Sequence, residues 1–544
     1  MVQNFPIASP LQGDPDDVNA QIAIPTDTIR LEGKPLSFAD FVRIGSRRAL
    51  IVPDAAALER VHKARQVMED AINSGQPVYG ATTGVGAMKD ISWSDDDLDA
   101  FSTGLVRAHH FGTGSAFPLE VVRNALAIRI NMALTGRVGC TPELVSAFQR
   151  LLDADVIPVV RRTGSIGCAD IGLMGQIGAV LTGVGEAYHS GERLPAAEAM
   201  ARAGLKPFKL APRDSLASVS TNAVGYAAAM RAIRQAATTV RVLLATGLTT
   251  AGALGASRDP WKAVAHVGTE REAGVGAWLY FNAMGWDWPT GTHVQDPLSI
   301  RMMSQVFATA FESLTVAGRT VLAATGRTDD NPAVAGGQVL TSGGSLPLDV
   351  TVFLQTAQLA LAHVARNSFN RCVLLGNGGR RDLPVNLVAP GAIATGFGPI
   401  IKLAGELFVR CLSLSNAISA QSLVVANGLE DEAAFLPLVV ERFERQAGAL
   451  RRLAALEGLL AAQAMDISGD NPGNVPGMVY ELVRRHAAFY REDRPLSAEV
   501  EAVEAALASD DFVGELISHS AIMELDEYFA LGPQTGTEPT TVMN

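Results

Sequence analysis

The segment with the clearest potential for chemistry is residues 163–174, a glycine-rich stretch that contains Ser165, Cys168 and Asp170. Glycine permits positive φ angles and a close approach of the backbone to a bound group. The apolar run that follows predicts a buried helix, whose N-terminal N–H groups point back toward the loop. Such a loop is more typical of a reactive centre than of a packed core, although its glycine spacing matches no phosphate-binding loop.

A tyrosine on a second glycine-rich loop is the next candidate. In residues 76–86, Tyr79 is followed by Gly80, Gly84 and Gly86, and the helical pattern of the preceding residues stops here. A loop of this composition can move, and mobile loops often carry functional residues.

Long apolar segments must position these two loops. Their alanine-rich helical patterns are too long and too uniformly apolar for ordinary surface helices, and they occupy residues 216–246, 299–324, 350–370, 399–424 and 432–467. Shorter helical patterns occur at residues 37–74, 119–134, 142–152 and 473–517. The sequence therefore predicts an all-α fold built on a bundle of long antiparallel helices.

These patterns divide the chain into four regions. We expect an N-terminal arm at 1–35, an N-terminal helical domain with both loops at 36–215, the long-helix bundle at 216–470, and short helices with a tail at 471–544.

Composition excludes several classes of protein. A net charge of -12 argues against sequence-independent binding of nucleic acid. The first residues lack the basic end and apolar core of a secretory signal, and no uninterrupted apolar stretch reaches the ~18 residues of a membrane span. The cysteines have neither disulfide-framework nor zinc-site spacing; they are Cys140, Cys168, Cys372 and Cys411. Isolated cysteines and the missing signal favour the cytoplasm, and no cluster of metal ligands is apparent. Since 48% of residues are hydrophobic and only 6% aromatic, we expect close-packed helices whose buried faces extend into the subunit contacts of an oligomer.

Short motifs along the chain are more specific in combination than singly. They are Tyr79-Gly-x-x-Thr83-Gly-x-Gly86, Gly164-Ser-Ile-Gly167 followed by Asp170, Gln295-Asp-Pro-x-Ser-x-Arg301, Asp330-Asn-Pro332 and Ala461-Ala-Gln-Ala-Met-Asp466. Together they give residues 37–520 a resemblance to the aromatic amino acid ammonia-lyases, especially histidine ammonia-lyase. The resemblance implies an all-α homotetramer whose long helices form a shared core, with each active site assembled from several subunits.

The centre of the first loop departs from the family pattern. In the family, an Ala-Ser-Gly tripeptide cyclises and dehydrates to a methylidene-imidazolone, an electrophile that helps to expel ammonia. Here only Cys168 and Ala169 stand in place of that tripeptide, so one residue is missing. Two family residues that support the electrophile, an Asn and a Tyr, are replaced by Ser220 and Leu298. The chain thus most resembles the ergothionases, the members that lack this group, and we expect no cofactor.

The resemblance also assigns roles to single residues. Tyr79 matches the catalytic base, a phenol whose pKa its neighbours lower, and Arg301 matches the arginine that binds the substrate carboxylate. His109 and Glu430 match positions where histidine-specific relatives keep His and Glu, and an acid there accepts a hydrogen bond from an azole N–H. A one-residue ambiguity in the alignment leaves two alternatives to Glu430, namely Asp431 and Glu432.

A lysine provides the hint of a sulfur atom on the substrate. Lys402 stands in an otherwise mostly apolar run of a predicted bundle helix, and a buried lysine needs a partner. It binds an electron-rich atom such as a thione sulfur, or it pairs with Glu406 one turn along the helix; Lys89 is a weaker alternative for the same role. The further predicted substrate-binding residues are Ser220, Asn222 and Gln295.

These features imply a substrate with an imidazole-like ring, a carboxylate and a leaving group that needs no electrophile. A quaternary ammonium meets the last condition, since trimethylamine departs neutral and the quaternary nitrogen has no lone pair for an electrophile. The resemblance thus implies a lyase that eliminates trimethylamine from ergothioneine to give thiourocanate, with hercynine or another histidine betaine as the alternative substrate. Two other functions stay open: an ammonia-lyase or aminomutase with a cysteine-derived methylidene-imidazolone, and a non-catalytic paralogue.

Overall fold

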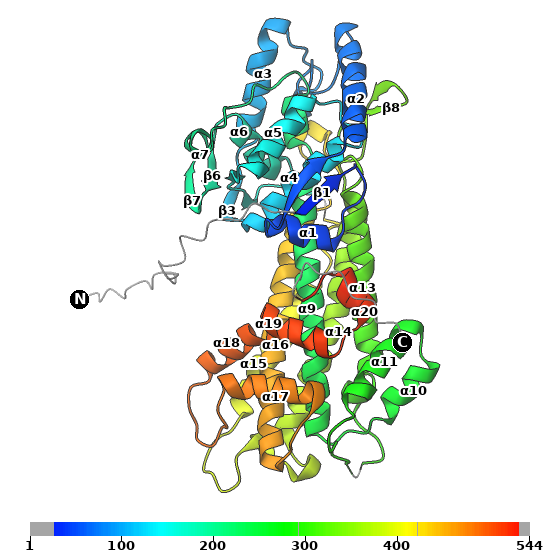
Figure 1. The fold of residues 1–544 in the computed structure, drawn as a ribbon, viewed down its shortest axis with the longest axis vertical. Coiled ribbons are helices and arrows are strands. Elements are labelled where there is room, and N and C mark those ends of the chain that lie inside the picture. The colour runs from blue at the N-terminus through cyan, green and yellow to red at the C-terminus, as the bar shows by residue number, and fades with distance from the viewer. Residues whose placement is uncertain (1–26, 292, 422, 533–544) are drawn as a thin grey trace, which may run out of the picture.

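The chain is elongated, with long helices along its main axis that join two lobes (Figure 1). The computed structural model describes residues 27–291, 293–421 and 423–532; most of the predicted arm and most of the predicted tail lie outside these residues. N-terminal elements surround one end of the long helices, and elements from the middle and the C-terminal part of the chain surround the other end.

Four long helices form the axis and confirm the predicted all-α bundle. They are α9 (Ala223–Ala253), α13 (Met303–Ala324), α14 (Leu348–Asn377) and α16 (Leu436–Ser468). Alanine and leucine, which favour helix formation, dominate their sequences, and proline occurs only in the first turn of α16. Nearly all residues of α9 are buried, because small side chains let the neighbouring helices approach closely.

The boundaries of some helices differ from the prediction. Segment 216–246 is split into α8 (Asp214–Val219) and α9, because the backbone leaves helical geometry at Ser220. Segment 399–424 ends early, as α15 (Gly398–Leu414). There the side-chain oxygen of Gln355 accepts hydrogen bonds from the N–H groups of Ile418 and Ser419, which holds this backbone in a loop.

The N-terminal lobe contains short strands that the helical pattern missed. Residues 37–74 are not one helical region: β2 (Ala49–Pro53) separates α1 (Phe38–Gly45) from α2 (Ala55–Asn73). The described end of the predicted arm is a strand as well, since β1 (Asp27–Leu31) pairs with β2 in parallel. The left-handed backbone of Arg47 ends the first helix, and the aliphatic run Ala49–Pro53 alternates between buried and exposed positions as a strand requires.

The other elements of this lobe surround the two glycine-rich loops. Its helices are α3 (Asp95–Ala108), α4 (Leu119–Ala133), α5 (Pro142–Asp153), α6 (Ile171–Leu181) and α7 (Ala196–Arg202). Its strands are β3 (Thr113–Ala116), β4 (Ile157–Pro158), β5 (Arg161–Thr163), β6 (Glu186–His189) and β7 (Glu192–Pro195). The antiparallel pairs are β3 with β5, β4 with β6, and β6 with β7. As predicted, the first loop leads into a buried helix, α6.

The remaining elements complete the other lobe and the ends of the bundle. They are α10 (Asp259–Val267), α11 (Glu270–Asn282), α12 (Leu298–Arg301), the hairpin of β8 (Ala333–Ala335) and β9 (Gln338–Leu340), α17 (Asn474–His486), α18 (Ser497–Leu507), α19 (Asp510–His519) and α20 (Met523–Tyr528).

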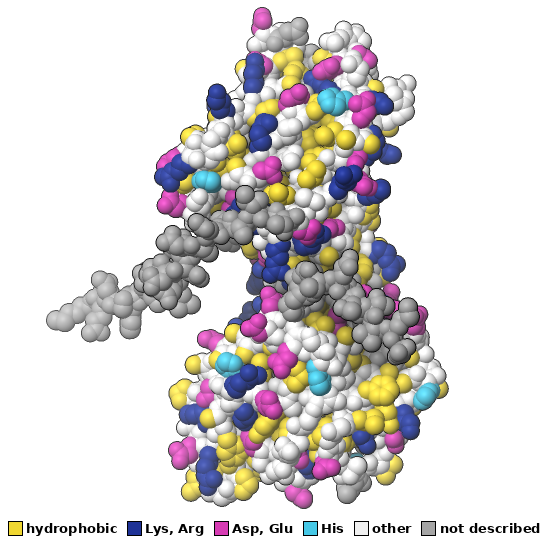
Figure 2. All heavy atoms as spheres, viewed as in Figure 1, with side chains coloured by type: hydrophobic (Ala, Val, Ile, Leu, Met, Phe, Trp, Pro, Cys, Tyr) yellow, Lys and Arg dark blue, Asp and Glu magenta, His cyan; other side chains and the backbone are white. Residues whose placement is uncertain are grey.

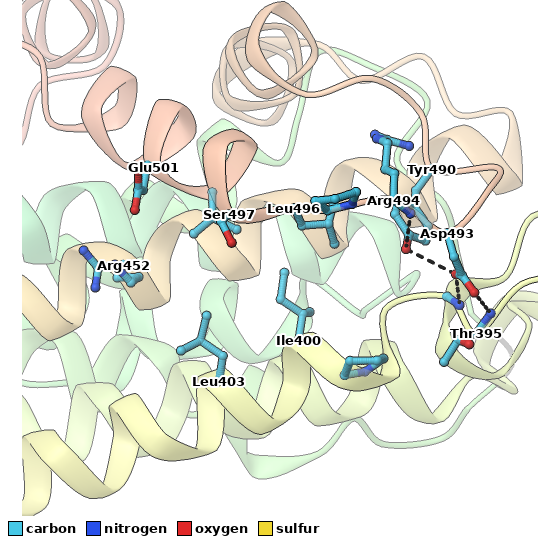
Figure 3. A pocket seen from close by; sticks show the side chains of 14 residues that line it. Thr395, Ile400, Leu403, Arg452, Tyr490, Asp493, Arg494, Leu496, Ser497 and Glu501 are labelled. Carbon is cyan, nitrogen blue, oxygen red and sulfur yellow. Dashed lines mark hydrogen bonds between the residues drawn. The ribbon is translucent and has the colours of Figure 1, made fainter. Parts of the chain in front are cut away.

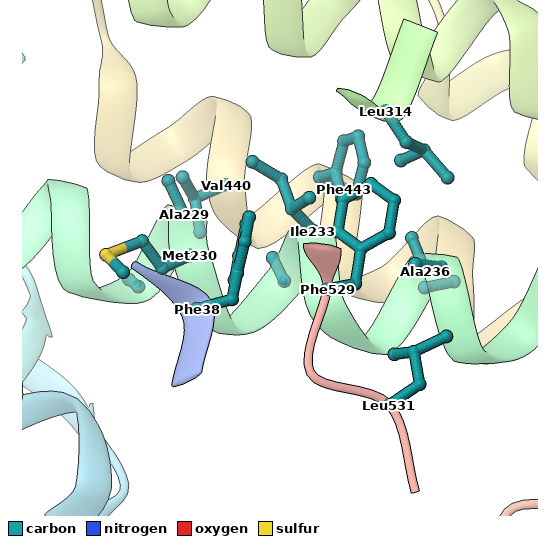
Figure 4. Close-up of a cluster of buried hydrophobic side chains, with 14 of the residues drawn as sticks. Phe38, Ala229, Met230, Ile233, Ala236, Leu314, Val440, Phe443, Phe529 and Leu531 are labelled. Carbon is teal, nitrogen blue, oxygen red and sulfur yellow. The ribbon is translucent and has the colours of Figure 1, made fainter. Parts of the chain in front are cut away.

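Both ends of the described chain pack on the middle of the bundle. Phe38 of α1 and Phe529, which follows α20, lie beside each other with ring centroids 5.4 Å apart. Figure 4 shows them with Ile233 of α9 and Phe443 of α16 in one buried apolar cluster. Burying a Phe side chain stabilises a fold by about 1.5–3 kcal/mol, so this cluster fastens the N-terminal lobe and the last helix to the bundle.

Surface charge, the apolar helices and the cysteines can be compared with the composition-based expectations. Acidic and basic side chains are interspersed over the described part of the face in Figure 2, without a continuous basic area. Two described helices, α13 and α14, are long and apolar enough to cross a membrane by length and composition alone. Half or more of each apolar window is buried inside this chain, as is typical of core helices. All four cysteines are free thiols.

Candidate active site

The candidate site is a cavity of about 720 Å³ at the end of the molecule that carries α2, α3 and β8 (Figure 1). Four segments far apart in the sequence form its wall: the Tyr79 loop, the loop with Cys168, the turn before α14, and the turn before α16. Of the predicted site residues, the cavity is lined by Tyr79, Lys89, His109, Ser220 and Glu430, together with Asp431 and Glu432.

A second hollow of about 710 Å³ lies between α15, α16 and α18 (Figure 3). Ile400 and Leu403 form an apolar floor, and three charged residues at its rim, Arg452, Asp493 and Arg494, bind neighbouring groups of the chain. Asp493 accepts hydrogen bonds from the Thr395 N–H, at 2.8 Å, and from the Tyr490 hydroxyl, at 3.2 Å. Most charged groups of this hollow are thus engaged within the chain, whereas the cavity with Tyr79 collects the predicted site residues, so that cavity is the candidate site.

Tyr79 is half-buried in the cavity wall, and its hydroxyl oxygen accepts a hydrogen bond from the Gly86 N–H at 2.9 Å. Burial raises the pKa of the Tyr79 phenol, the Gly86 N–H lowers it, and the nearby Glu430 and Cys168 raise it. The expectation that neighbours lower this pKa is therefore wrong for the single chain, because the titratable groups next to the phenol are acidic. A nearby cation would have to lower it.

The first glycine-rich loop is bound to other segments through its own backbone. The Ala169 N–H donates to the carbonyl oxygen of Ser345 at 3.0 Å, and the Ala434 N–H donates to the carbonyl of Gly167 at 3.3 Å. Gly167 has φ +72, and a Cβ there would lie 2.4 Å from the backbone nitrogens of Phe435 and Leu436, so only glycine fits. The shortened loop thus forms a fixed wall between the turn before α14 and the start of α16.

Cys168 faces the cavity from this wall. Its sulfur lies 3.3 Å from the hydroxyl oxygen of Ser345, and both residues are half-buried. Burial raises the pKa of the Cys168 thiol, the Ser345 hydroxyl lowers it, and the nearby acids Glu430, Asp170 and Asp329 raise it. A thiol with a raised pKa is a weak nucleophile at neutral pH.

Two buried carboxyl groups lie behind the wall. Asp170 accepts hydrogen bonds from the Ser165 hydroxyl at 2.7 Å and from the Gly225 N–H at 2.8 Å, and burial raises its pKa to about 6. Asp329 accepts hydrogen bonds from the backbone N–H and the side-chain amide of Asn222 at 2.8 and 2.9 Å, and burial raises its pKa to about 7. Both acids meet the first turn of α9, whose N–H groups favour the ionised carboxylate.

Glu430 is held by a short turn before α16. Its backbone pairs with Val425, whose N–H donates to the Glu430 carbonyl at 2.9 Å. Asp431 and Glu432 also line the cavity but are exposed, whereas Glu430 is half-buried. Glu430 is also the acid of the three that raises the pKa of Tyr79, which favours it for a contact with a bound ring.

His109 and Lys89 lie at other parts of the wall. The Nδ1 atom of His109, at the end of α3, is 2.7 Å from the carbonyl oxygen of Leu105, so Nδ1 donates and Nε2 of the neutral ring is an acceptor. Lys89 is exposed and forms an ion pair with Asp90. Ser220 is buried and lines the cavity.

Asn222 lies behind the wall. It is fully buried, and its side-chain amide donates to Asp329 and, at 2.8 Å, to the carbonyl of Ser345. Ser345 therefore receives hydrogen bonds from both Asn222 and Ala169, which makes Asn222 a support of the loop. Its predicted direct contact with substrate has no counterpart in this cavity.

Three predicted site residues lie at the opposite end of the bundle. Gln295 is exposed, Arg301 ends α12, and Lys402 is exposed in the first turns of α15. The expectation that Lys402 is buried is wrong for the single chain, because the buried side of α15 is formed by residues such as Ile400 and Ala404. Its predicted pairing with Glu406 is also wrong, since the carboxylate of Glu406 binds Arg410.

The length of α14 gives the distance between the cavity with Tyr79 and the end of the bundle that carries Arg301 and Lys402. Ser345 lines the cavity just before α14, and Arg380, just after its 30 residues, binds Asp296 near Arg301. A rise of 1.5 Å per residue gives about 45 Å between these ends. Lys402 belongs to the far end, because the side chain of its neighbour Ile401 packs over Gly376. One chain therefore does not bring Arg301 or Lys402 to its own Tyr79.

Sequence reasoning missed several residues that shape the site. Ser345 and Asn331 line the cavity, and Asp329 lies behind it. The Asp330-Asn-Pro332 motif pointed to this region without indicating a role. Ser345 had no signal of its own, because its importance comes from contacts with residues more than a hundred positions away.

Comparisons with known proteins agree with the fold and the motifs. A sequence model described as aromatic amino acid lyase matches residues 36–485. Histidine ammonia-lyase of Stigmatella aurantiaca is 30% identical over 500 residues, which cover 90% of this chain and 97% of that protein.

Solved structures of related proteins have a similar fold. The ergothioneine-degrading enzyme ergothionase of Treponema denticola, in complex with desmethyl-ergothioneine sulfonic acid, has a TM-score of 0.86 and 28% identity, covering 89% of this chain and 99% of its own. Histidine ammonia-lyase of Trypanosoma cruzi is similar in fold, with a TM-score of 0.82 and 21% identity over 94% of this chain and 99% of its own.

Proposed function

The chain belongs to the aromatic amino acid lyase family and is a carbon–nitrogen lyase, and we propose that its own reaction is the elimination of trimethylamine from ergothioneine to give thiourocanate. The base removes a proton from the β-carbon, the bond between the α-carbon and nitrogen breaks, and its electron pair leaves with neutral trimethylamine. The new double bond is conjugated with the thioimidazole ring, which stabilises charge that develops at the β-carbon.

The observation that carries this proposal is the bonding of the shortened loop. A methylidene-imidazolone made from Cys168 would need the Ala169 nitrogen to attack the Gly167 carbonyl carbon. That nitrogen donates its hydrogen to Ser345, the Gly167 carbonyl accepts from Ala434, and Ala169 replaces the flexible glycine. The residues present therefore do not fit this prosthetic group, and a leaving group that needs no electrophile is the consistent choice.

Within this proposal the cavity supplies the base and the ring contacts. Tyr79 removes the β-proton, Glu430 accepts a hydrogen bond from a ring N–H, and His109 orients the ring with Nε2. Lys89 and Ser220 complete the polar wall around the substrate.

The far end of a second copy supplies the cationic part of the site. Arg301 of that copy binds the carboxylate, Gln295 lies beside it, and Lys402 binds the thione sulfur. The positive charges of Arg301 and Lys402 also lower the raised pKa of Tyr79 toward the range in which a phenol acts as a base. We therefore propose a homotetramer with sites shared between chains, in the cytoplasm, where the free thiols are stable.

The comparisons support both the proposal and its main alternative. Ergothionase of Treponema denticola, at 28% identity, favours a betaine substrate. Histidine ammonia-lyase of Stigmatella aurantiaca, at 30% identity, favours histidine and release of ammonia. The bonding of the Ala169 loop supports the betaine.

The test is turnover by the purified full-length protein. Ergothioneine, hercynine and histidine are supplied separately, and the conjugated ultraviolet product is measured together with trimethylamine or ammonia. The proposal expects trimethylamine from ergothioneine, a lower kcat/KM with hercynine, and no ammonia from histidine. Ammonia from histidine, with an intact mass that lacks water and hydrogen sulfide, would establish the alternative instead. Binding of ergothioneine without any product would indicate a non-catalytic paralogue.

A further inference from the structure

Arg380 lies in the turn after α14, far from the cavity of its own chain. Its guanidinium forms an ion pair with Asp296, and its Nε donates to the carbonyl oxygen of Leu254 at 3.3 Å. The side chain of Arg380 is 13% exposed and that of Asp296 is 4% exposed. The pair is thus shielded from water, where a charge-assisted hydrogen bond is strong and the loss of one partner is costly.

Asp296 connects this ion pair to Arg301. One carboxylate oxygen of Asp296 binds Arg380, and the other accepts a hydrogen bond from the Ser257 N–H at 2.7 Å. The backbone carbonyl of the same Asp296 accepts a hydrogen bond from Nε of Arg301 at 2.8 Å. The orientation of the Asp296 peptide therefore sets the plane of the Arg301 guanidinium.

The other nitrogens of Arg301 remain available for a ligand. Among the residues that the structure describes, only the Asp296 carbonyl bonds to this guanidinium. The short helix α12 is also fixed on its other side, because the carbonyl of Ser299 accepts hydrogen bonds from Asn367 at 3.0 Å and from Arg371 at 3.2 Å. The Nη edge of Arg301 is then a pre-oriented site for a planar anion.

We propose that Arg380 is a positioning residue for carboxylate recognition: through Asp296 it fixes the guanidinium of Arg301 that binds the substrate carboxylate. This inference rests on the role of Arg301 in the proposed function. A bidentate contact between a guanidinium and a carboxylate depends on the relative orientation of the two planes, so a side chain that fixes one plane increases affinity without touching the substrate.

The neighbouring Arg381 provides a matched control. It binds Asp470 through two hydrogen bonds of 2.7 and 2.6 Å and also donates to the carbonyl of Ala253. Arg381→Gln therefore removes a similar ion pair from the same turn without touching Asp296. Any effect of Arg380→Gln that arises only from loosening of this turn will be reproduced by Arg381→Gln.

The experiment measures the affinity of the full-length enzyme for two probes, imidazole-4-propionate and 4-ethylimidazole, which differ by the carboxylate. Wild type is expected to prefer the propionate, and Arg380→Gln to reduce this preference by about tenfold, the usual effect of losing a charge-assisted hydrogen bond. Arg380→Lys should restore part of the preference, since the charge next to Asp296 returns. Arg381→Gln should keep the preference of wild type.

Turnover of ergothioneine by the same preparations separates the two proposals. If wild type releases no trimethylamine but the probe preference falls only in Arg380→Gln, the proposed reaction is wrong and the positioning role stands. The positioning role is overturned if Arg380→Gln keeps the wild-type preference, if Arg381→Gln loses it equally, or if wild type has no preference for the carboxylate.

Discussion

Mixing two inactive variants tests whether Tyr79 and Arg301 act in one site from different chains. The cavity with Tyr79 and the α12 end with Arg301 are separated by the length of α14, about 45 Å. Tyr79→Phe removes the proposed base, which should lower kcat by about 10²- to 10⁴-fold. Arg301→Ala should inactivate by loss of carboxylate binding. Each variant alone, as the proposed homotetramer, should then be inactive.

Subunit statistics give the magnitude of the recovery. In tetramers formed at random from equal amounts of the two variants, a site is intact when its cavity comes from an Arg301→Ala chain and its arginine from a Tyr79→Phe chain. Each condition holds for half of the sites, so about a quarter of the wild-type kcat per site should return. If both residues came from one chain, every site would keep a defect and no activity would return.

Co-expression with two affinity tags isolates the mixed tetramers for this assay. The control mixes Tyr79→Phe with Glu430→Gln, because these residues line the same cavity of one chain. Every cavity in that mixture keeps one defect, so its activity should stay at the level of the parents. Mixed tetramers of Tyr79→Phe and Arg301→Ala that form normally and remain inactive would refute the shared site.

Three further substitutions test the chemistry of the cavity wall. Burial raises the pKa of Asp329 from 3.8 to about 7, so the ionisation of this one carboxyl should lower the stability of wild type by about 4 kcal/mol as pH rises through this window. The free energy of unfolding of Asp329→Asn, measured with urea relative to that of wild type, should therefore be more favourable at pH 8 than at pH 4. An equal difference between the two proteins at pH 4 and pH 8 would contradict this. Glu430→Gln should lower the pKa of Tyr79 and shift the rising limb of the pH–rate profile to lower pH, with a higher KM; an unshifted limb would count against Tyr79 as base. Cys168→Ala should keep turnover, and its loss would favour a cysteine-derived electrophile.

The sequence predicted the bundle because long alanine-rich segments leave few other ways to bury their surface. It did not predict β2, because a strand of 5 residues between two helices gives a weak periodic signal. The early end of α15 was also hidden from sequence, since it depends on the side chain of Gln355, more than sixty positions away.

The candidate site was predicted only in part, because some of its residues are defined by contacts that form only in the folded chain. The family resemblance identified Tyr79, His109 and Glu430, which the structure brings to one cavity. It also identified Arg301, which lies at the other end of the bundle and reaches the cavity of a second copy only in the proposed oligomer. Neither motif nor periodicity revealed Ser345, whose contacts form only after the turn before α14 packs against the shortened loop.

The shortened loop links these contacts to the choice of leaving group. Its left-handed residues Gly167, Ala169 and Asp170 turn the backbone so that its polar groups bind Ser345, Thr221 and the start of α16. Cyclisation would have to break two of these bonds, those of the Ala169 N–H and the Gly167 carbonyl, in a place where an unpaired buried amide costs about 1–3 kcal/mol. This bonding therefore opposes the conversion of the loop into an electrophile. In the proposed reaction the driving force for breaking the carbon–nitrogen bond comes from the substrate, because a quaternary ammonium leaves as a neutral amine.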